Sequence, residues 1–219
     1  MSEPTRFARA RTEQQREERR ESILDTAATL LQDSRIAELT LNELARRVGL
    51  AKSNVLRYFE SREAVLLELM AREYDAWLDV LDRELDSTAT ADVDRVAEAV
   101  ARTASERPLL CELLSNASIV LEHNVSADVA AAYKRGALAG AIRLGSLLTG
   151  APADERSALL AGAVNLAVGG VWGMCRPSRG MLAAYEVHPE LAAYRLDLRT
   201  TLQELVATLL TGAASRRSR

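Results

Sequence analysis

The sequence predicts an all-α protein in which a group of three short helices precedes a larger helical bundle. Aromatic residues make up only 4% of the chain while Leu and Ala dominate, a composition that favours packed helices over sheets. Apolar residues recur at i, i+3, i+4 and i+7 along most of the 219 residues, as they do on one face of a helix. No stretch shows the period-two alternation that indicates a strand.

The first 18 residues lack that apolar periodicity, and we expect them to form a flexible arm. A solvated tail is one interpretation of the arm, and contact with phosphates or a minor groove is the other. The arginines that would make this contact are Arg6, Arg9, Arg11 and Arg16. The first helix is expected from about Gln15 to Leu31. Its inner face consists of Ile23, Leu24, Ala27, Leu30 and Leu31.

The second and third helices meet at a tight turn. Thr40, followed three residues later by Glu43, is a capping box, in which the hydroxyl accepts one orphan backbone N–H and the carboxylate accepts another. Gly49 ends the second helix, because glycine adopts left-handed geometry without a steric penalty. The third helix begins near Ala51 and carries the residues up to Phe59. Two helices joined in this way form a helix-turn-helix, whose second helix fits the major groove of DNA.

An ordinary helical hairpin with a solvated polar face would have the same spacing, but two flanking features argue against it. Residues 57–66 end one helix, and Ser61 caps the start of the next. Upstream, residues 19–31 form an amphipathic helix that can buttress the pair. In order and spacing, residues 19–69 resemble the DNA-binding region of the tetracycline-repressor (TetR) family of bacterial transcription regulators, over about a quarter of the chain.

Three exposed side chains of the third helix are predicted to meet base edges. They are Ser53, Asn54 and Arg57, and the residue types fit because Arg suits guanine and Asn suits adenine. Leu56 departs from the family, many members of which carry a tyrosine there that typically contacts DNA. A leucine cannot donate a hydrogen bond to phosphate, so at this position it can only pack, for example on a thymine methyl group.

Five further residues are predicted to contact the DNA backbone. Lys52, Tyr58 and Arg62 are placed for phosphates, with Arg62 at the N-terminus of the next helix. Thr40 and Arg47 can flank the groove. Residues 1–62 carry 12 Lys and Arg against 10 Asp and Glu, whereas residues 63–219 carry 16 against 21, which gives +2 and −5. This mild asymmetry supports nucleic-acid binding only weakly.

Downstream of the helix-turn-helix, the apolar spacing predicts helices that form a regulatory bundle. The first runs from Arg62 to about Asp86 and joins the DNA-reading part to the rest. The next two run from Asp92 to Glu106 and from Pro108 to Leu121, since proline suits the first helical position. Another follows from the cap at Ser126 to Thr149.

The C-terminal part is predicted to hold two more long helices. Residues 154–175 are rich in Ala and Gly, and their apolar stretch is close to the shortest that spans a membrane. We expect a helix buried on all sides in the bundle, and no membrane partner. A loop follows at residues 176–180, and a closing helix is expected from Glu190 to Leu210. Residues 213–219 are expected to form a disordered basic tail.

These two C-terminal helices are the predicted homodimer interface, because Gly and Ala on one face allow close approach of helices. In the family that the chain resembles, the corresponding pair commonly forms a four-helix bundle with the partner. A small, largely apolar ligand is predicted inside the bundle, and the alternative is that the same residues simply fill a core. The predicted lining consists of Cys111, Leu114, Ser115, His123 and Trp172.

Motifs for enzymatic chemistry are missing: the sequence has no G-x-S-x-G, no phosphate-binding loop and only two histidines. We expect no catalytic residue, no metal and no cofactor, and the two distant cysteines favour reduced thiols in the cytoplasm. The predicted domains are an arm (1–18), a helix-turn-helix domain (19–62), a ligand-binding and dimerisation domain (63–212) and the tail (213–219). The predicted function is a repressor that a ligand releases from a palindromic operator. The alternatives are a DNA-bound adaptor that binds a protein, and an enzyme on the same frame.

Overall fold

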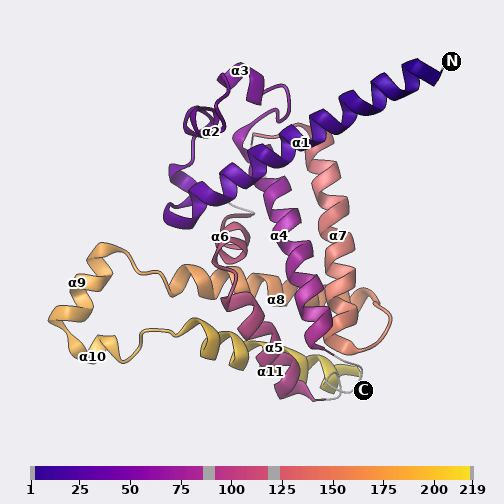
Figure 1. The fold of residues 1–219 in the computed structure, drawn as a ribbon. Coiled ribbons are helices and arrows are strands. Elements are labelled where there is room, and N and C mark those ends of the chain that lie inside the picture. The colour runs from indigo at the N-terminus through magenta and orange to yellow at the C-terminus, as the bar shows by residue number, and fades with distance from the viewer. Residues whose placement is uncertain (1–2, 86–91, 118–123, 218–219) are drawn as a thin grey trace.

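The computed structural model describes residues 3–85, 92–117 and 124–217, and every regular element within these ranges is a helix. This confirms the all-α prediction. The first helices gather at one end of the long helix α4 (Arg62–Glu84), and two helices cross near its other end (Figure 1). These two are α8 (Glu155–Met174) and α11 (Leu198–Arg217), and they run in opposite directions.

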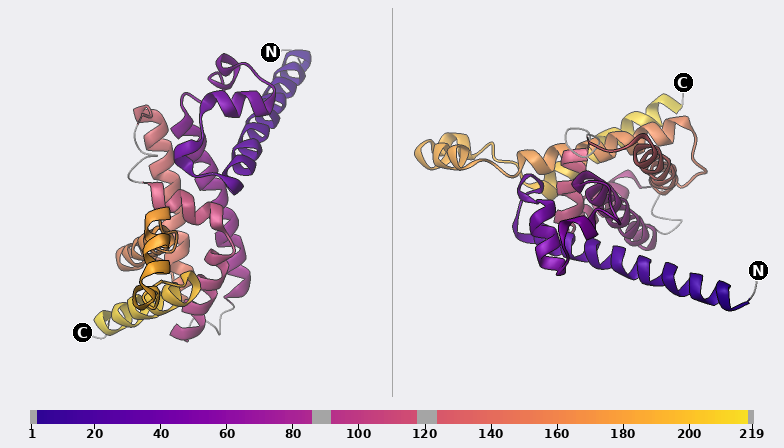
Figure 2. Two further views of the ribbon diagram at one scale, coloured as in Figure 1. Left: turned by 90° about the vertical axis from the view of Figure 1, so that its left-hand side faces the viewer. Right: turned by 90° about the horizontal axis from the view of Figure 1, so that it is seen from above.

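Helix α1 (Glu3–Asp33) is longer than predicted. The expectation of an arm without regular structure before about Gln15 was wrong, since the helix begins at Glu3 and extends beyond the rest of the molecule (Figure 2). Residues 5–33 contain neither Gly nor Pro and are rich in Glu, Arg, Gln and Ala, which have high helix propensity. Helix propensity therefore extends the helix where apolar periodicity gave no signal.

The N-terminal helices enclose a small core of their own, which we call the head core. It forms where α1 packs on α2 (Leu41–Val48) and α4, with the 3₁₀ helix Ile36–Glu38 and α3 (Lys52–Val55) at its edges. The fully buried side chains at its centre include Ile23, Leu24, Ile36, Leu44 and Val55. Leu113 of α6 (Pro108–Asn116) also belongs to this core, so the bundle reaches into the head.

A second core, the bundle core, lies between the C-terminal half of α4 and α5 (Val93–Ser105), α6, α7 (Ala127–Thr149), α8 and α11. Trp77 is fully buried in it, and its indole nitrogen donates to the hydroxyl of Thr103 over 2.9 Å. Pro108 opens α6 and Ser126 caps α7, as predicted. The predicted end of α6 at Leu121 lies outside the described residues.

Helix α8 is covered on one side only. By length and composition it could cross a membrane, since its most apolar stretch has a mean hydropathy of 1.5. Instead it packs against α6, α7 and α11, and 39% of that stretch is buried. Within the single chain it is not buried on all sides, because Leu159 and Leu166 are 75% and 77% exposed, and its complete burial stays a prediction that depends on the homodimer.

The chain between α8 and α11 also differs from the prediction. The expected loop at residues 176–180 is shorter, because Ser178 caps a helix that was not predicted, α9 (Arg179–Val187). The closing helix expected from Glu190 is interrupted: α10 (Pro189–Ala192) ends after one turn, and α11 starts at Leu198. Helix α11 then continues to Arg217, where a disordered tail was expected.

Candidate nucleic-acid interface

The turn between α2 and α3 has the geometry that its sequence predicts. The hydroxyl of Thr40 accepts the N–H of Glu43 over 3.2 Å, and Gly49 ends α2 in the left-handed region with φ of 75°. The N–H of Leu50 then donates back to the carbonyl of Ala45 over 2.9 Å, which closes the helix end as glycine caps do. This fixes the direction in which the chain enters α3.

The carboxylate of Glu43 binds differently from the predicted capping box. It accepts from the guanidinium of Arg46 over 2.9 and 2.5 Å and lies 3.6 Å from Arg47. The hydrogen bond from Arg46 lowers the pKa of Glu43, so this carboxyl stays ionised on the exposed face of α2. Thr40 and Arg47 are both exposed beside the turn, as a contact with the DNA backbone requires.

Helix α3 presents its polar side chains outward. Val55 is fully buried and anchors the helix in the head core, whereas Lys52, Ser53, Asn54 and Arg57 are exposed. The regular helix ends at Val55, earlier than predicted, because the next turns tighten: the N–H of Arg57 bonds the carbonyl of Asn54 three residues back. Ser53 and Asn54 therefore lie on α3 itself and Arg57 lies in the tight turn that follows it, and all three are exposed beside the anchor at Val55.

Leu56 is exposed beside these polar side chains. Its exposed fraction is 40%, and it is the one exposed large apolar side chain among the side chains described before α4. The expectation that Leu56 faces inward with Val55 and Phe59 was therefore wrong. An exposed leucine can pack on a thymine methyl group, and this contact stays a prediction.

Arg62 and Tyr58 are held by the head itself. The guanidinium of Arg62 donates to the carbonyl of Leu39 over 3.1 Å and to Glu63 over 2.9 and 3.0 Å. These bonds tie the start of α4 to the loop before α2, a structural role that sequence reasoning missed. Tyr58 is half-buried, and its carbonyl accepts from Arg20. Contact of these two side chains with phosphate stays a prediction.

Arg20 is the residue that fixes α3 against α1 and α4. Its guanidinium donates to the Tyr58 carbonyl over 2.6 Å, pairs with Glu68 and lies 4.5 Å from the centre of the Phe59 ring. A single arginine thus joins three helical segments of the head. Sequence reasoning missed this role and placed Arg20 only on the first amphipathic helix.

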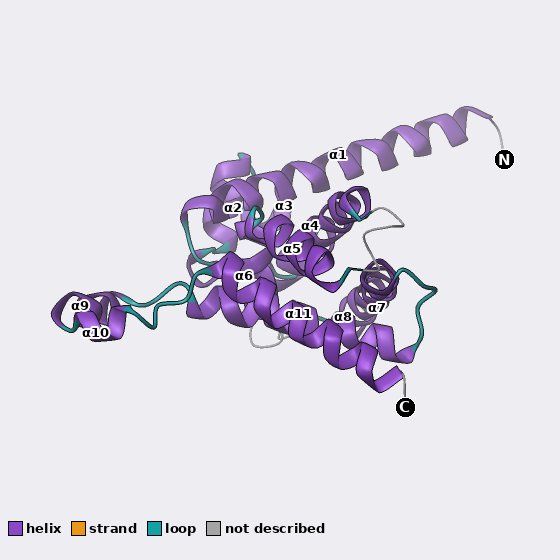
Figure 3. Ribbon diagram, turned by 90° about the horizontal axis from the view of Figure 1, so that it is seen from below, coloured by secondary structure: helices purple, strands orange, loops and turns teal. Residues whose placement is uncertain are grey.

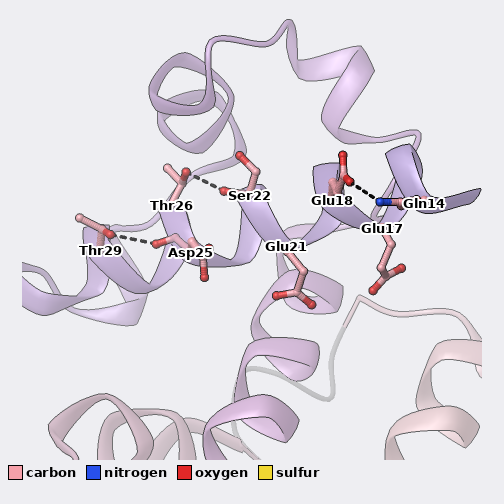
Figure 4. A pocket seen from close by; sticks show the side chains of 8 residues that line it. All are labelled: Gln14, Glu17, Glu18, Glu21, Ser22, Asp25, Thr26 and Thr29. Atoms are coloured by element: carbon pink, nitrogen blue, oxygen red, sulfur yellow. Dashed lines mark hydrogen bonds between the residues drawn. The ribbon is translucent and has the colours of Figure 1, made fainter. Parts of the chain in front are cut away.

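Positive and negative charge lie on different parts of α1. Arg16 and Arg57 line one surface hollow of about 420 Å³ together with Gln15 and Tyr58. Another side of α1 is an open, acidic surface (Figure 4). Its carboxylates are those of Glu17, Glu18, Glu21 and Asp25. Because phosphates repel carboxylates, we expect DNA to approach the side with Arg16 and Arg57.

Two family models match this chain. Residues 23–69 match the one described as "Bacterial regulatory proteins, tetR family". Residues 71–217, which are more than half of the chain, match the one described as "Tetracyclin repressor-like, C-terminal domain". The chain belongs to the TetR family. It is therefore a helix-turn-helix transcriptional regulator and not an enzyme, and the resemblance of residues 19–69 is confirmed.

Curated relatives match over less than half of the chain. The chain is 39% identical to the transcriptional regulator EthR of Mycobacterium tuberculosis over 56 residues, 26% of each chain. It is 33% identical to the regulator Rv1816 of the same species over 103 residues, 45% of this chain and 44% of that one. The chain thus spans less than half the length of either relative.

Solved TetR-family structures share the fold over most of the chain. A regulator from Rhodococcus sp. RHA1 superposes with a TM-score of 0.56 at 19% identity, covering 91% of this chain and 98% of the other. One from Shewanella sp. PV-4 gives 0.52 at 17% identity, covering 89% and 97%. At this level of identity the likeness establishes the fold alone.

The TetR-type bundle of this chain contains a cavity of about 110 Å³ next to the head. Its lining comes from α4, α6, α7 and α8 and consists of Met70, Ala71, Tyr74, Asp75, Leu114, Tyr133, Gly136, Ala137 and Asn165. The side chain of Asn165 and the phenol of Tyr74 are joined by hydrogen bonds of 2.9 and 3.1 Å. Burial raises the pKa of Tyr74 to about 12, so the phenol stays protonated.

Leu114 is the one residue of the predicted ligand set that the structure places at this cavity. Cys111 is fully buried in the bundle core, where its thiol donates to the Ala104 carbonyl over 3.3 Å. Trp172 lies at a separate surface hollow, and its indole nitrogen donates to Glu112 over 2.7 Å. Ser115 packs against Gly173, and His123 lies outside the described residues.

Proposed function

We propose that this TetR-family chain is a cytoplasmic, homodimeric repressor that a small, largely apolar ligand releases from a near-palindromic operator. The observation that carries the proposal is the position of the cavity, which lies between the bundle and the head that carries α3. Two copies of α3 would enter successive major grooves, about 34–36 Å or a multiple of this apart. Any movement that changes this spacing lowers operator affinity.

DNA contacts divide by residue type. Asn54 on α3 and Arg57 in the turn after it, both exposed, would read adenine and guanine edges, with Ser53 beside them. Lys52 and Arg16 would bind phosphates on either side of the reading surface. The hollow that Arg16 shares with Arg57 supports a phosphate at this point, because two guanidinium groups can donate to it together.

The ligand would act by a shift of populations. A cavity of about 110 Å³ is smaller than the roughly 300–1,000 Å³ of most small-molecule sites. A larger ligand therefore binds only a form in which α4 and α7 have separated. Because this form binds the ligand better than the compact form does, the ligand favours it at the expense of the compact one. A coupling free energy of about 1–3 kcal/mol gives 5–150-fold release from DNA.

Two contacts connect the cavity with the head. Leu114 lines the cavity and also packs against the head core beside Leu113. The carboxylate of Glu60, in the turn between α3 and α4, accepts the N–H of Ser126 at the N-terminus of α7 over 2.5 Å. A displacement of α7 would therefore pull on the segment that follows the reading helix, with α4 as the lever.

Filling the cavity tests the proposal. A Cβ added at Gly136 meets nothing within 4 Å, so Gly136→Met can place its side chain in the open space without a clash. We expect a ligand found by a thermal-shift screen to lose affinity for this variant at least tenfold. Operator affinity without ligand should stay within about twofold. Ala132→Met, on the exposed surface of the same helix, is the matched control and should bind the ligand normally.

The decisive readout is operator affinity, measured by fluorescence anisotropy with and without the ligand. We expect the ligand to weaken operator binding of the unsubstituted protein and of Ala132→Met, and to leave Gly136→Met unaffected. A ligand that binds in the cavity, as shown by its loss in Gly136→Met, and leaves operator affinity unchanged would overturn the ligand-release mechanism.

The adaptor alternative has one observation in its favour. Leu138 and Ile142, one helical turn apart on α7, are 59% and 45% exposed. An apolar pair of this kind fits a protein partner. Leu138→Lys should leave ligand response and operator binding intact if the chain is a ligand-released repressor. Normal DNA binding in vitro with lost regulation in cells would favour the adaptor.

A further inference from the structure

Helices α9 and α10 stand out from the body of the molecule on two connecting segments (Figures 1 and 3). They pack on each other, and none of their residues, all of them described, is buried. We call residues 176–197 the arm, which is distinct from the N-terminal segment 1–18 that was predicted to be flexible. The arm begins where α8 ends and leads directly into α11, so it projects from one end of the α8/α11 layer.

The arm exposes more apolar surface than two short helices can carry alone. Its large exposed apolar side chains are Met181, Leu182, Val187, Leu191 and Tyr194, with exposed fractions between 39% and 82%. Isolated helices shorter than about 12–15 residues are marginal in water, and α9 has 9 residues and α10 has 4. Their stability therefore requires a surface that covers them.

A groove of fitting character lies at the opposite end of the same layer. It runs between the first half of α8 and the last half of α11, with a volume of about 470 Å³. Its apolar wall consists of Leu159, Leu160, Ala163, Leu209, Gly212 and Ala213. A Cβ at Gly212 would meet nothing within 4 Å, so the groove is open at this position. Arg156 and Arg216 line it with their positive charges.

The arm of the same chain does not fill the groove, because it projects away from the body at the other end of α8 (Figure 3). The groove follows α8 from Arg156 to Ala163, so its nearer end lies 11 residues, or about 17 Å of helix, from Met174, where α8 ends. A two-fold axis removes this separation. If both heads face one DNA duplex, the axis runs along the direction from the α8/α11 layer to the heads, and it reverses α8 (Figure 1). The last turn of one α8 then lies opposite the first turn of the partner's.

We propose that the arm of each protomer docks in the α8/α11 groove of a second copy of this chain, so that the dimer is closed by two exchanged arms. The inference rests on the dimer of the proposed function and adds the part of each copy that holds the other. Charge favours this occupant at the middle of the arm, because residues 180–194 contain Glu186 and Glu190 and neither Lys nor Arg. The arginines of the arm lie towards its two ends and are Arg176, Arg179 and Arg195. The two acidic residues would face Arg156 and Arg216 at the groove.

Photo-crosslinking locates the arm directly. A benzophenone amino acid replaces Val187, which is 72% exposed, in an equal mixture of ¹⁵N-labelled and unlabelled full-length protein. We expect crosslinks to residues 156–163 or 208–216, in peptide pairs that combine both isotopes. The same amino acid in place of Ala132 is the control and should not label these segments. Crosslinks within one chain, or to segments outside the groove, would overturn the proposal.

Charge reversal supplies the second test. Glu190→Arg and Arg216→Glu should each raise the dimer dissociation constant at least fivefold, and the double variant should recover most of the loss. Arg83→Glu, an exposed change on α4, is the control and should have no effect. Sedimentation equilibrium measures these constants, and circular dichroism confirms that each variant is folded.

The arm and the dimer can fail separately. If the unsubstituted protein is a monomer and binds no duplex, the proposed function fails. If it is a dimer that binds duplex DNA and reversal of the charges is not compensated in the double variant, the exchanged arm is wrong and the dimer stands.

Discussion

The head buries nearly all of its large apolar side chains, whereas helices α8–α11, which we call the C-terminal layer, expose many of theirs. Among the side chains described before α4, Leu56 is the one exposed large apolar side chain. Along α8–α11 there are nine: Leu159, Leu166, Met174, Met181, Leu182, Val187, Leu191, Tyr194 and Leu205. Both regions are helical, but residues 155–217 contain fewer charged and more apolar residues than residues 3–56. The C-terminal part therefore has more apolar surface than a single chain covers.

The difference indicates two kinds of recognition. The head is complete within one chain, because Arg20, Arg62 and the cap at Gly49 fix its short helices around a closed core. It can then present polar side chains to DNA at little cost in ordering. The C-terminal layer leaves large apolar side chains exposed, which is what the proposed interface between identical chains requires.

The largest expected effect is loss of the dimer on placing a charge in the C-terminal layer. Leu166 is 77% exposed in the single chain, so Leu166→Glu should not unfold it. If this surface is buried between two copies, each dimer would contain two unpaired carboxylates, at a cost of about 3–5 kcal/mol. The dimer dissociation constant, measured by sedimentation equilibrium, should rise at least a hundredfold, and operator affinity should fall with it.

Leu56→Glu makes the same change in the head and provides the comparison. It should weaken DNA binding by bringing a carboxylate near phosphates, and it should leave the dimer intact. Equal dimer stability for Leu166→Glu and the unsubstituted protein would show that α8 is not at the interface, and the contrast between the two regions would be lost.

The next effect in size concerns pH and should originate in the bundle. Burial raises the pKa of Cys111 from 9.0 to about 12 and that of Tyr74 from 10.0 to about 12. Because both folded pKa values are raised, the stabilisation is complete below pH 9 and is lost as the pH rises towards 12. The free energy of unfolding should fall by about 1.4 kcal/mol per pH unit for each group inside its window.

Both tryptophans, Trp77 and Trp172, lie in the bundle, so urea titrations followed by tryptophan fluorescence report on this region. Cys111→Ala should reduce the slope between pH 9 and 12. An unchanged slope in that variant would mean that the thiol is not buried in the native protein, and the closed bundle core would need revision.

The DNA-contact predictions sharpen the description of the head. Asn54→Ala and Arg57→Ala should each cost about 1–3 kcal/mol of operator affinity and relax preference at particular base pairs. Lys52→Ala should weaken binding to all duplexes and reduce the slope against log salt by about one. Anisotropy titrations across salt concentrations and operator variants separate the two classes. A uniform loss for all three variants would contradict the assignment of base readers.

Arg62→Ala should differ from these three. Its bond to the Leu39 carbonyl predicts a loss of about 1.5–3 kcal/mol in the free energy of unfolding, since a charged donor is removed from a half-buried site. Thermal denaturation of the variant distinguishes this structural role from a phosphate contact, which would leave the unfolding temperature unchanged.

The sequence was most informative where a local rule fixes a helix end. Thr40, Gly49, Ser61, Pro108 and Ser126 all end or begin helices as their residue types require. It was least informative where structure depends on distant contacts. The arm has helical periodicity too short to be recognised, and α1 extends through residues with high propensity and no apolar stripe.

The candidate sites follow the same division. Exposure of Ser53, Asn54 and Arg57 follows from the position of Val55 in one short helix, so sequence spacing was sufficient. The cavity instead joins Tyr74 and Asn165, which are 91 residues apart. No spacing rule connects two such residues. Arg20 and Arg62 were similarly beyond prediction, because their partners are carbonyl groups of remote segments.

The smallest expected effects come from alanine at three glycines and test the two regions by backbone alone. Gly49→Ala should destabilise the protein by about 1 kcal/mol, because the head requires φ of +75° there. Gly136→Ala in α7 should stabilise it by about 0.5–1 kcal/mol, since helix propensity improves and the new Cβ meets open space beside the cavity. Gly140→Ala, four residues further on, should destabilise instead, because its Cβ would lie 2.7 Å from the Tyr74 ring. Urea denaturation measures all three, and a loss at Gly136 as large as that at Gly140 would mean that α7 is as tightly packed at the cavity as beside Tyr74, leaving a ligand no room to enter.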